Sequence, residues 1–187
     1  MNLEPVKEDI PLTKVNRLIN SGSVILVTST SKEEKHNIIT IAWQMPVSCN
    51  PSLLAISIAK THFSHQLIET TKEFVINVPN ISLLEQVKFC GSVSGRDIDK
   101  FNGSNLTPIP AQIVKPPLIK ECIGHLECTV IKIHPSGDHT IFIGKIVAAY
   151  VNRNLFDGAY WDLSKEETNL IYHFGGTLFA TVSKVIN

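Results

Sequence analysis

Residues that could bind an anion gather just before a helical pattern in the first half of this chain. Lys60 and Thr61 are followed by Ser64 and His65, and residues 66–69 then begin a helical pattern. A helix start exposes unpaired backbone N–H groups and a partial positive charge, to which the hydroxyls and the Lys60 ammonium would add. The sequence therefore predicts an anion site of the kind that a phosphate would occupy. An alternative of equal weight is that Thr61 or Ser64 only caps the helix.

Other reactive side chains nearby do not assemble into a known motif. His62 and His65 lie three positions apart without an HExxH pattern or paired cysteines, so surface positions on a helix are favoured over a metal site. Cys49 has no Lys or His directly beside it, which argues against an activated thiolate. No Ser-His-acid order stands out. We therefore nominate no catalytic residue and no metal ligand.

Two further segments could contribute to a site. Residues 91–96 are rich in small residues, but they match neither GxGxxG nor the P-loop pattern, and a helix stop followed by a turn explains them adequately. Trp43 stands at a strand end before Pro46; such a residue is more often part of a core, yet its indole could form a flat wall for a ring system. The segment from Asn37 to His65 is thus a reasonable place for a phosphorylated, planar cofactor.

The elements that must position these residues are predicted to be mostly strands. Pro46 and the corner at residues 49–51 are expected to interrupt the ladder, because proline gives no N–H to a central strand. Short helices are expected at residues 13–21, just after Thr61, and at 82–90. Few helices and antiparallel hairpins favour an all-β barrel decorated with helices. The predicted strands are residues 24–30, 37–42, 53–59, 74–79, 125–134 and 139–151.

The bulk composition is that of a globular protein. Hydrophobic residues make up 43% of the 187 residues, and 17 Lys and Arg balance 17 Asp and Glu. This balance, with no basic stripe, argues against nucleic acid as a partner. No apolar run approaches the ~20 residues that a membrane span needs. The start of the chain lacks the pattern of an export signal, so we expect a cytoplasmic protein, with its four cysteines reduced.

Several segments, in this order and spacing, resemble the flavin reductase-like family, which has the FMN-binding split-barrel fold, and within it the flavoredoxin-type branch. The resemblance covers roughly residues 21–150. It implies a mainly β, six-stranded antiparallel Greek-key split barrel with a few peripheral helices, assembled as a homodimer with FMN near the subunit interface. The segments that carry it are residues 24–29, 37–43, 46–48 with Pro51, 57–60 with Ser64 and His65, 74–79, 90–91, 94–96 and 99–101.

The same resemblance implies which residues contact FMN. Those expected to line the isoalloxazine ring and the ribityl chain are Thr40, Ala42, Trp43, Gln44, Met45 and Ser48. Those expected to hold the phosphate, in agreement with the helix-start argument, are Ala59, Lys60, Thr61, Ser64 and His65. A loop near the ring would supply Cys90, Gly91, Ser94 and Gly95, and a histidine near the flavin in ferric-reductase-like relatives matches His139.

The function implied is that of an FMN flavoprotein oxidoreductase. It would pass electrons from NAD(P)H or a redox partner through FMN to free flavin, ferric iron or a protein. The alternatives are a flavoredoxin-type electron carrier without NAD(P)H turnover, and a non-catalytic ligand-binding split-barrel module. The expected organisation is an arm with a short helix over residues 1–20, the FMN-binding domain over 21–151, and a C-terminal extension over 152–187 that packs on the barrel or on a dimer partner.

Overall fold

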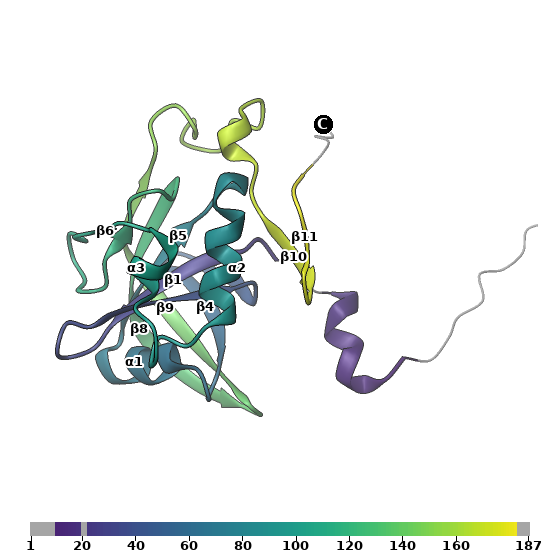
Figure 1. The fold of residues 1–187 in the computed structure, drawn as a ribbon. Helices are drawn as coiled ribbons and strands as arrows, with labels where there is room; N and C mark the ends of the chain where they lie inside the picture. The colour runs from purple at the N-terminus through teal and green to yellow at the C-terminus, as the bar shows by residue number, and fades with distance from the viewer. Residues whose placement is uncertain (1–9, 20–21, 183–187) are drawn as a thin grey trace, which may run out of the picture.

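The computed structural model describes residues 10–19 and 22–182 of the chain. Its centre is a seven-stranded antiparallel sheet in the order β2-β1-β5-β8-β9-β4-β3 (Figure 1). The mainly β class and the antiparallel pairing predicted from the sequence are confirmed. The strands are β1 (Ile25–Thr30), β2 (His36–Ile41), β3 (Gln44–Cys49), β4 (Ser52–Ala59), β5 (Glu73–Val78), β8 (Gly124–Ser136) and β9 (His139–Val151).

The short connection between β2 and β3 brings the two ends of this sheet close together, so the sheet curls around a single core as an open barrel. Only Ala42 and Trp43 separate β2 from β3, the first and last strands in the sheet order. At this point the Ser57 N–H of β4 donates to the Trp43 carbonyl at 2.9 Å. The enclosed core draws on six strands and on α1 (Phe63–Thr71), through Ile25, Val27, Ile39, Ile41, Leu54, Ile56, Ile58, Ile68, Phe74, Ile76, Cys128 and Phe142.

The expected count of six strands is wrong because the segment around Pro46 is itself a strand. β3 pairs with β4 from Gln44 to Cys49, with an irregularity in the register between Pro46 and Ser48. β3 lies at the edge of the sheet, and an edge strand tolerates a proline that a central strand would exclude. Pro46 therefore marks the edge of the sheet and not a break in it.

Strands β1 and β2 are buried on both faces. Ile25 and Val27 point into the barrel, whereas Leu26 and Ile38 point to a second core on the outside. Two helices cover that outer face, α2 (Leu84–Ser92) and α3 (Lys100–Ser104). Burial on both faces explains why residues 24–27 form a continuous apolar run and do not alternate.

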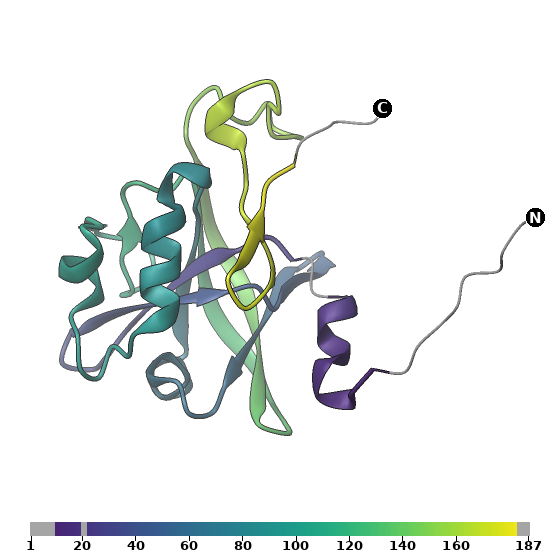
Figure 2. The same cartoon turned by 45° about the vertical axis from the view of Figure 1, so that its right-hand side comes forward.

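The remaining elements lie around the barrel. A hairpin of β10 (Tyr172–Gly175) and β11 (Leu178–Ala180) lies beside α2, on the side away from α3 (Figures 1 and 2). The 3₁₀ helix η1 (Leu12–Leu18) buries none of its residues and stands beside the barrel (Figure 2). The other short elements are η2 (Ile81–Leu83), β6 (Pro108–Ile109), β7 (Leu118–Ile119) and η3 (Glu166–Thr168).

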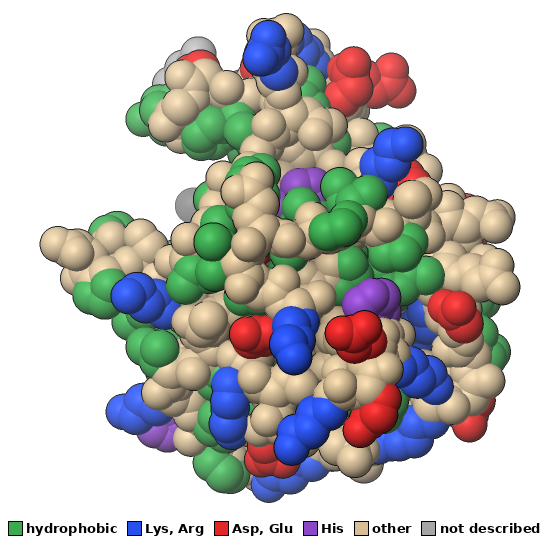
Figure 3. All heavy atoms as spheres, turned by 90° about the vertical axis from the view of Figure 1, so that its left-hand side faces the viewer, with side chains coloured by type: hydrophobic (Ala, Val, Ile, Leu, Met, Phe, Trp, Pro, Cys, Tyr) green, Lys and Arg blue, Asp and Glu red, His purple; other side chains and the backbone are tan. Residues whose placement is uncertain are grey.

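Charge on the molecule's surface is mixed in sign. On the face drawn in Figure 3, Lys and Arg side chains are interspersed with Asp and Glu, as a formal net charge of zero would suggest. Over the residues that the structure describes, no helix has the length and apolar character to cross a membrane.

Candidate functional site

A cavity of about 380 Å³ opens where β2, the start of α1 and the loop after α2 meet. We call it the cationic cavity, because Arg96 and Lys100 line it and its described lining contains neither Asp nor Glu. It brings together seven of the residues that the sequence predicted. Those seven are Thr40, Thr61, Ser64, Cys90, Gly91, Ser94 and Gly95.

The start of α1 forms one wall of the cationic cavity. The N-cap residue is His62, and its side chain makes no capping hydrogen bond. Ser64 is buried inside the first turn, where its Oγ accepts a hydrogen bond from Asn37 Nδ2 at 2.6 Å. The capping alternative for Thr61 and Ser64 therefore does not describe this helix. Its N-terminus faces the cavity with the partial positive charge that favours an anion.

Lys100 carries a buried positive charge into the same cavity. Lys100 is only 5% exposed, and its Nζ donates to the Cys90 carbonyl at 2.7 Å. The neighbouring Asp99 carboxylate instead accepts from the N–H groups of Phe101 and Asn102 and caps α3. Burial lowers the pKa of Lys100. An ammonium has three N–H donors, and the Cys90 carbonyl accepts from only one of them. An anion in the cavity would accept hydrogen bonds from the others.

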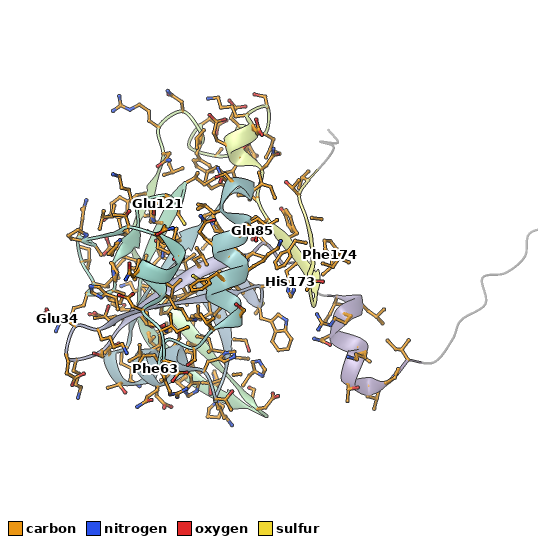
Figure 4. All side chains as sticks on the ribbon, in the orientation of Figure 1. Glu34, Phe63, Glu85, Glu121, His173 and Phe174 are labelled. Carbon is orange, nitrogen blue, oxygen red and sulfur yellow. The ribbon has the colours of Figure 1, made fainter. Side chains whose placement is uncertain are left out.

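Arg96 is held over the mouth of the cavity. Its Nη1 donates to the Thr61 carbonyl at 3.0 Å, and its guanidinium lies 5.4 Å from the centre of the Phe63 ring. The ammonium of Lys35 lies 5.7 Å from the same ring. Figure 4 shows Phe63 at the end of the barrel where α1 lies. Burial, followed by the electrostatic effects of His139 and Lys100, lowers the pKa of His62.

Position 95 requires a glycine, because Asn37 lies directly against it. A Cβ added at Gly95 would lie 1.9 Å from Asn37 Oδ1, so no larger residue fits without moving Asn37. Asn37 Oδ1 is buried and has no hydrogen-bond partner among the described residues. The two ends of an amide are distinguished only by their partners. In the flipped orientation, Asn37 would accept from Ser64 and keep a free N–H donor beside the cavity.

A second cavity of about 480 Å³ continues from the cationic cavity along β2. The two share Thr40, Gly91 and Ser92, and the Thr40 hydroxyl donates to the Val87 carbonyl at 2.6 Å. We call it the hairpin cavity, because the β10–β11 hairpin supplies part of its wall; Figure 4 shows His173 there. It is lined by Val24, Thr40, Ala42, Val87, Lys88, Gly91, Ser92, His173, Gly176, Thr177 and Phe179.

A third cavity, also of about 480 Å³, lies on the other side of Ala42. We call it the apolar cavity, because its described lining contains no Lys, Arg, Asp or Glu. The Trp43 ring, in its wall, lies 4.8 Å from the His139 ring at an angle of 30°. The lining residues are Asn16, Ile19, Gly22, Ala42, Trp43, Gln44, Met45, Ala55, Ile56, Ser57 and Ile141.

Five of the predicted residues line none of these three cavities. Lys60 Nζ donates to the Gly137 carbonyl at 2.6 Å, at the turn between β8 and β9. Ala59 pairs with His139 in the β4–β9 ladder, and Ser48 pairs with Leu53 in the β3–β4 ladder. The positive charge that the sequence assigned to Lys60 therefore comes, in the cavity itself, from Arg96 and Lys100.

The two predicted histidines outside the cavities differ in their surroundings. His65 is 7% exposed, and its Nε2 lies 2.8 Å from the Thr140 hydroxyl. Burial lowers the pKa of His65, against the raising effect of Glu69. His139 is nearer the surface, with Nδ1 hydrogen-bonded to Asp138 at 2.7 Å. His65 thus links the first turn of α1 to β9 through Thr140, whereas the His139 ring packs against the Trp43 ring.

Sequence reasoning missed the residues that reach this site from a distance. Arg96 and Lys100 lie in two segments that carry the family resemblance, 94–96 and 99–101, but neither residue was assigned a contact, and His173 lies in the C-terminal hairpin. The sequence offered one signal for Asn37, a polar residue at the start of an otherwise apolar strand. Its partner Ser64 is 27 positions away, so the pairing is visible only in three dimensions.

Comparison with known proteins identifies the family. The model of the flavin reductase like domain matches residues 17–179, and the chain therefore belongs to this family. An uncharacterized protein of Archaeoglobus fulgidus is 42% identical over 114 residues, which are 61% of this chain and 64% of that protein. The uncharacterized protein YddH of Escherichia coli is 31% identical over 179 residues, 94% of each chain.

Solved structures share the fold over nearly the whole chain. Flavoredoxin of Desulfovibrio vulgaris superposes with a TM-score of 0.81 at 22% identity, covering 100% of this chain and 96% of that one. Nitrilotriacetate monooxygenase component B from Bacillus cereus gives a TM-score of 0.84 at 18% identity, covering 100% and 98%. The resemblance to the FMN-binding split-barrel proteins noted from the sequence is thereby confirmed.

Proposed function

We propose that this protein binds FMN in the connected cationic and hairpin cavities and acts as a flavin reductase-like oxidoreductase. The observation that carries the proposal is the buried ammonium of Lys100, facing a cavity whose described lining has no carboxylate. A buried charge is costly unless an opposite charge is close to it. A phosphate monoester supplies that charge, and membership in the flavin reductase-like family makes FMN the ligand to test.

The cavities suggest how the parts of FMN would be held. The phosphate would meet Arg96, Lys100 and the start of α1, and the ribityl chain would pass Thr40 and Gly91, which line both cavities. The ring would then lie in the hairpin cavity, with one edge at Ala42 and the backbone that leads into β3. Bound FMN supplies the electron-transfer chemistry, while the protein binds the cofactor, orients it and limits access to it.

The electron donor separates two forms of this function. In the first, NAD(P)H reduces the flavin, and free flavin, ferric iron or a protein accepts the electrons. The likeness to a monooxygenase component supports this form. In the second, the protein is an electron carrier served by a protein donor, as the likeness to flavoredoxin would suggest. Steady-state NADH and NADPH oxidation with free FMN or a ferric chelate distinguishes them, because a pure carrier shows little turnover.

The test of FMN binding itself is spectroscopic. Protein purified without added flavin should be yellow, or the colourless protein should bind added FMN with a Kd in the micromolar range or below. Riboflavin, which lacks the phosphate, is the matched ligand control and should bind at least tenfold more weakly. Absence of a flavin spectrum together with no FMN binding would contradict the proposal. FMN binding without any electron transfer would leave the non-catalytic module as the function.

We also propose that the protein forms a homodimer, with residues 21–151 as the flavin-binding domain and 152–187 as an extension on it. On the edge strand β3, Val47 is 41% exposed, and Leu178 on the β10–β11 hairpin is 63% exposed. Exposed apolar edge strands are usually covered in the native assembly. Sedimentation equilibrium should give twice the mass of one chain. A monomer at micromolar concentration would contradict the dimer and leave the FMN proposal intact.

A further inference from the structure

The apolar cavity differs in kind from the site proposed for FMN. Its volume of about 480 Å³ falls within the range of small-molecule sites, roughly 300–1,000 Å³. It shares only Ala42 with the hairpin cavity, and it shares no lining residue with the cationic cavity. It is therefore a separate space that opens next to the proposed position of the flavin ring.

The walls of this cavity favour a flat and uncharged ligand. An ionised ligand would lose hydration without gaining an opposite charge, because no charged side chain is among the described residues that line the cavity. The Trp43 indole offers a planar face, supported from behind by the His139 ring at 4.8 Å. Ala55 and Ile56, buried in β4, form part of the wall.

Three neutral polar side chains give the cavity limited hydrogen-bonding capacity. Gln44 Nε2 lies 3.1 Å from the Ser23 hydroxyl, which fixes the amide. Ser57 is held in β4 through its backbone N–H, which donates to the Trp43 carbonyl, so its hydroxyl stands at a defined place on the wall. Asn16 reaches the cavity from η1. A hydroxyl or an amide N–H can donate to the carbonyl oxygen of a neutral ligand.

We infer that the apolar cavity binds a small, uncharged, planar carbonyl compound, of which quinones are the chemical class to test, and that this compound is the electron acceptor. The role as acceptor rests on the proposed FMN site beside Ala42, whereas binding does not. With NAD(P)H as donor, the net reaction balances: NAD(P)H gives up a hydride, the solvent gives up a proton, and the quinone becomes a hydroquinone.

Menadione, an uncharged naphthoquinone, is the probe, and 1,4-naphthoquinone-2-sulfonate is its charged counterpart. Equilibrium dialysis with the FMN-loaded full-length protein should show one saturable menadione site and at least tenfold weaker binding of the sulfonate. Equal binding of the two, or no saturable binding of menadione, would overturn the inference. The second result would include the case in which a second copy of the chain covers the cavity.

Two serines of β4 provide matched variants. Ser57 lines the apolar cavity, whereas Ser52 is exposed at the start of the same strand and lines none of the three cavities. Ser57→Leu should fill part of the cavity and weaken menadione binding at least tenfold, while Ser52→Leu should leave it within twofold of the wild type. Menadione binding that is the same in both variants would overturn the inference.

Two further variants and an FMN titration complete the test. Leu12, the first residue of η1, and Ile19, directly after its last residue, are 85% and 83% exposed, but only Ile19 lines the cavity. Ile19→Glu should therefore weaken menadione binding several-fold and Leu12→Glu should not; both positions are exposed, so neither change threatens folding. FMN affinity should change less than twofold in all four variants. If the wild-type protein binds menadione but not FMN, the proposed function is contradicted and the apolar binding site is retained.

Discussion

The cationic cavity and the apolar cavity lie at opposite ends of the same stretch of chain, from Asn37 to Trp43, yet they favour opposite kinds of ligand. At one end Arg96, Lys100 and the N-terminus of α1 concentrate positive charge. At the other, the described residues that line the cavity, among them Trp43 and its aliphatic neighbours, carry no charge. The difference arises from what packs against the strand. The loop after α2 and helix α3 bring Arg96 and Lys100 to its beginning, whereas β4 and β9 bring apolar side chains to its end.

The largest effect that would test this contrast is expected from Lys100→Met. A hydrogen bond to a charged group contributes about 1.5–3 kcal/mol, so FMN affinity should fall by roughly 10- to 100-fold. Riboflavin affinity should change little, since riboflavin has no phosphate. Flavin fluorescence quenching measures both, and Lys120→Met, far along the chain, is the matched control. Equal losses for FMN and riboflavin would show that Lys100 supports the fold and does not bind phosphate.

Gly95→Ala should have an intermediate effect, confined to the cationic end. The added Cβ would lie 1.9 Å from Asn37 Oδ1, which forces Asn37 away from Ser64 and disturbs the start of α1. We expect FMN affinity to fall about tenfold, in line with the loss of one hydrogen bond of about 1 kcal/mol plus some misplacement. Menadione binding should not change.

Ile98→Ala is the control for that prediction. Ile98 is 41% exposed in the same loop as Gly95, and it lines none of the three cavities. FMN titrations of the two alanine variants should therefore separate them clearly. Similar affinities would contradict the close fit between Gly95 and Asn37.

The smallest effect is expected from pH, and it too should distinguish the two cavities. Burial lowers the pKa of Lys100 in the protein without FMN, and a bound phosphate would favour the charged ammonium. At a pH above that lowered pKa, FMN binding should therefore take up a proton. FMN affinity should decline as the pH rises through the lowered pKa, which lies below the ~10.4 of an exposed lysine. We expect a change of several-fold across this window.

Isothermal titration of FMN at a series of alkaline pH values measures this decline. Lys100→Met should abolish it, because the variant has no ammonium to lose. Menadione binding should stay constant over the same range. A decline that persists in Lys100→Met would assign the effect to another group.

Much of the fold could be predicted from short-range sequence patterns. The sequence predicts strands over residues 24–30 and 37–42, and β1 and β2 form there and pair as a hairpin, from Ile25 with Ile41 to Thr30 with His36. β-Branched runs and turn residues act locally, so such hairpins are visible in the sequence. The exception was β3, since whether a strand may contain Pro46 depends on its place at the edge of the sheet.

By itself, the sequence determined the mainly β class and the membership that the flavin reductase like domain confirms, and it predicted an anion site at the start of α1. Tertiary structure decided which cation serves that site: Lys60, adjacent in sequence, bonds to Gly137, while Lys100 enters from α3. It also decided that Ala42 lies between the hairpin cavity and the apolar cavity. The physical reason is that strand and helix signals arise between near neighbours. The charge and polarity of a cavity depend instead on side chains that only the packing of distant segments brings together.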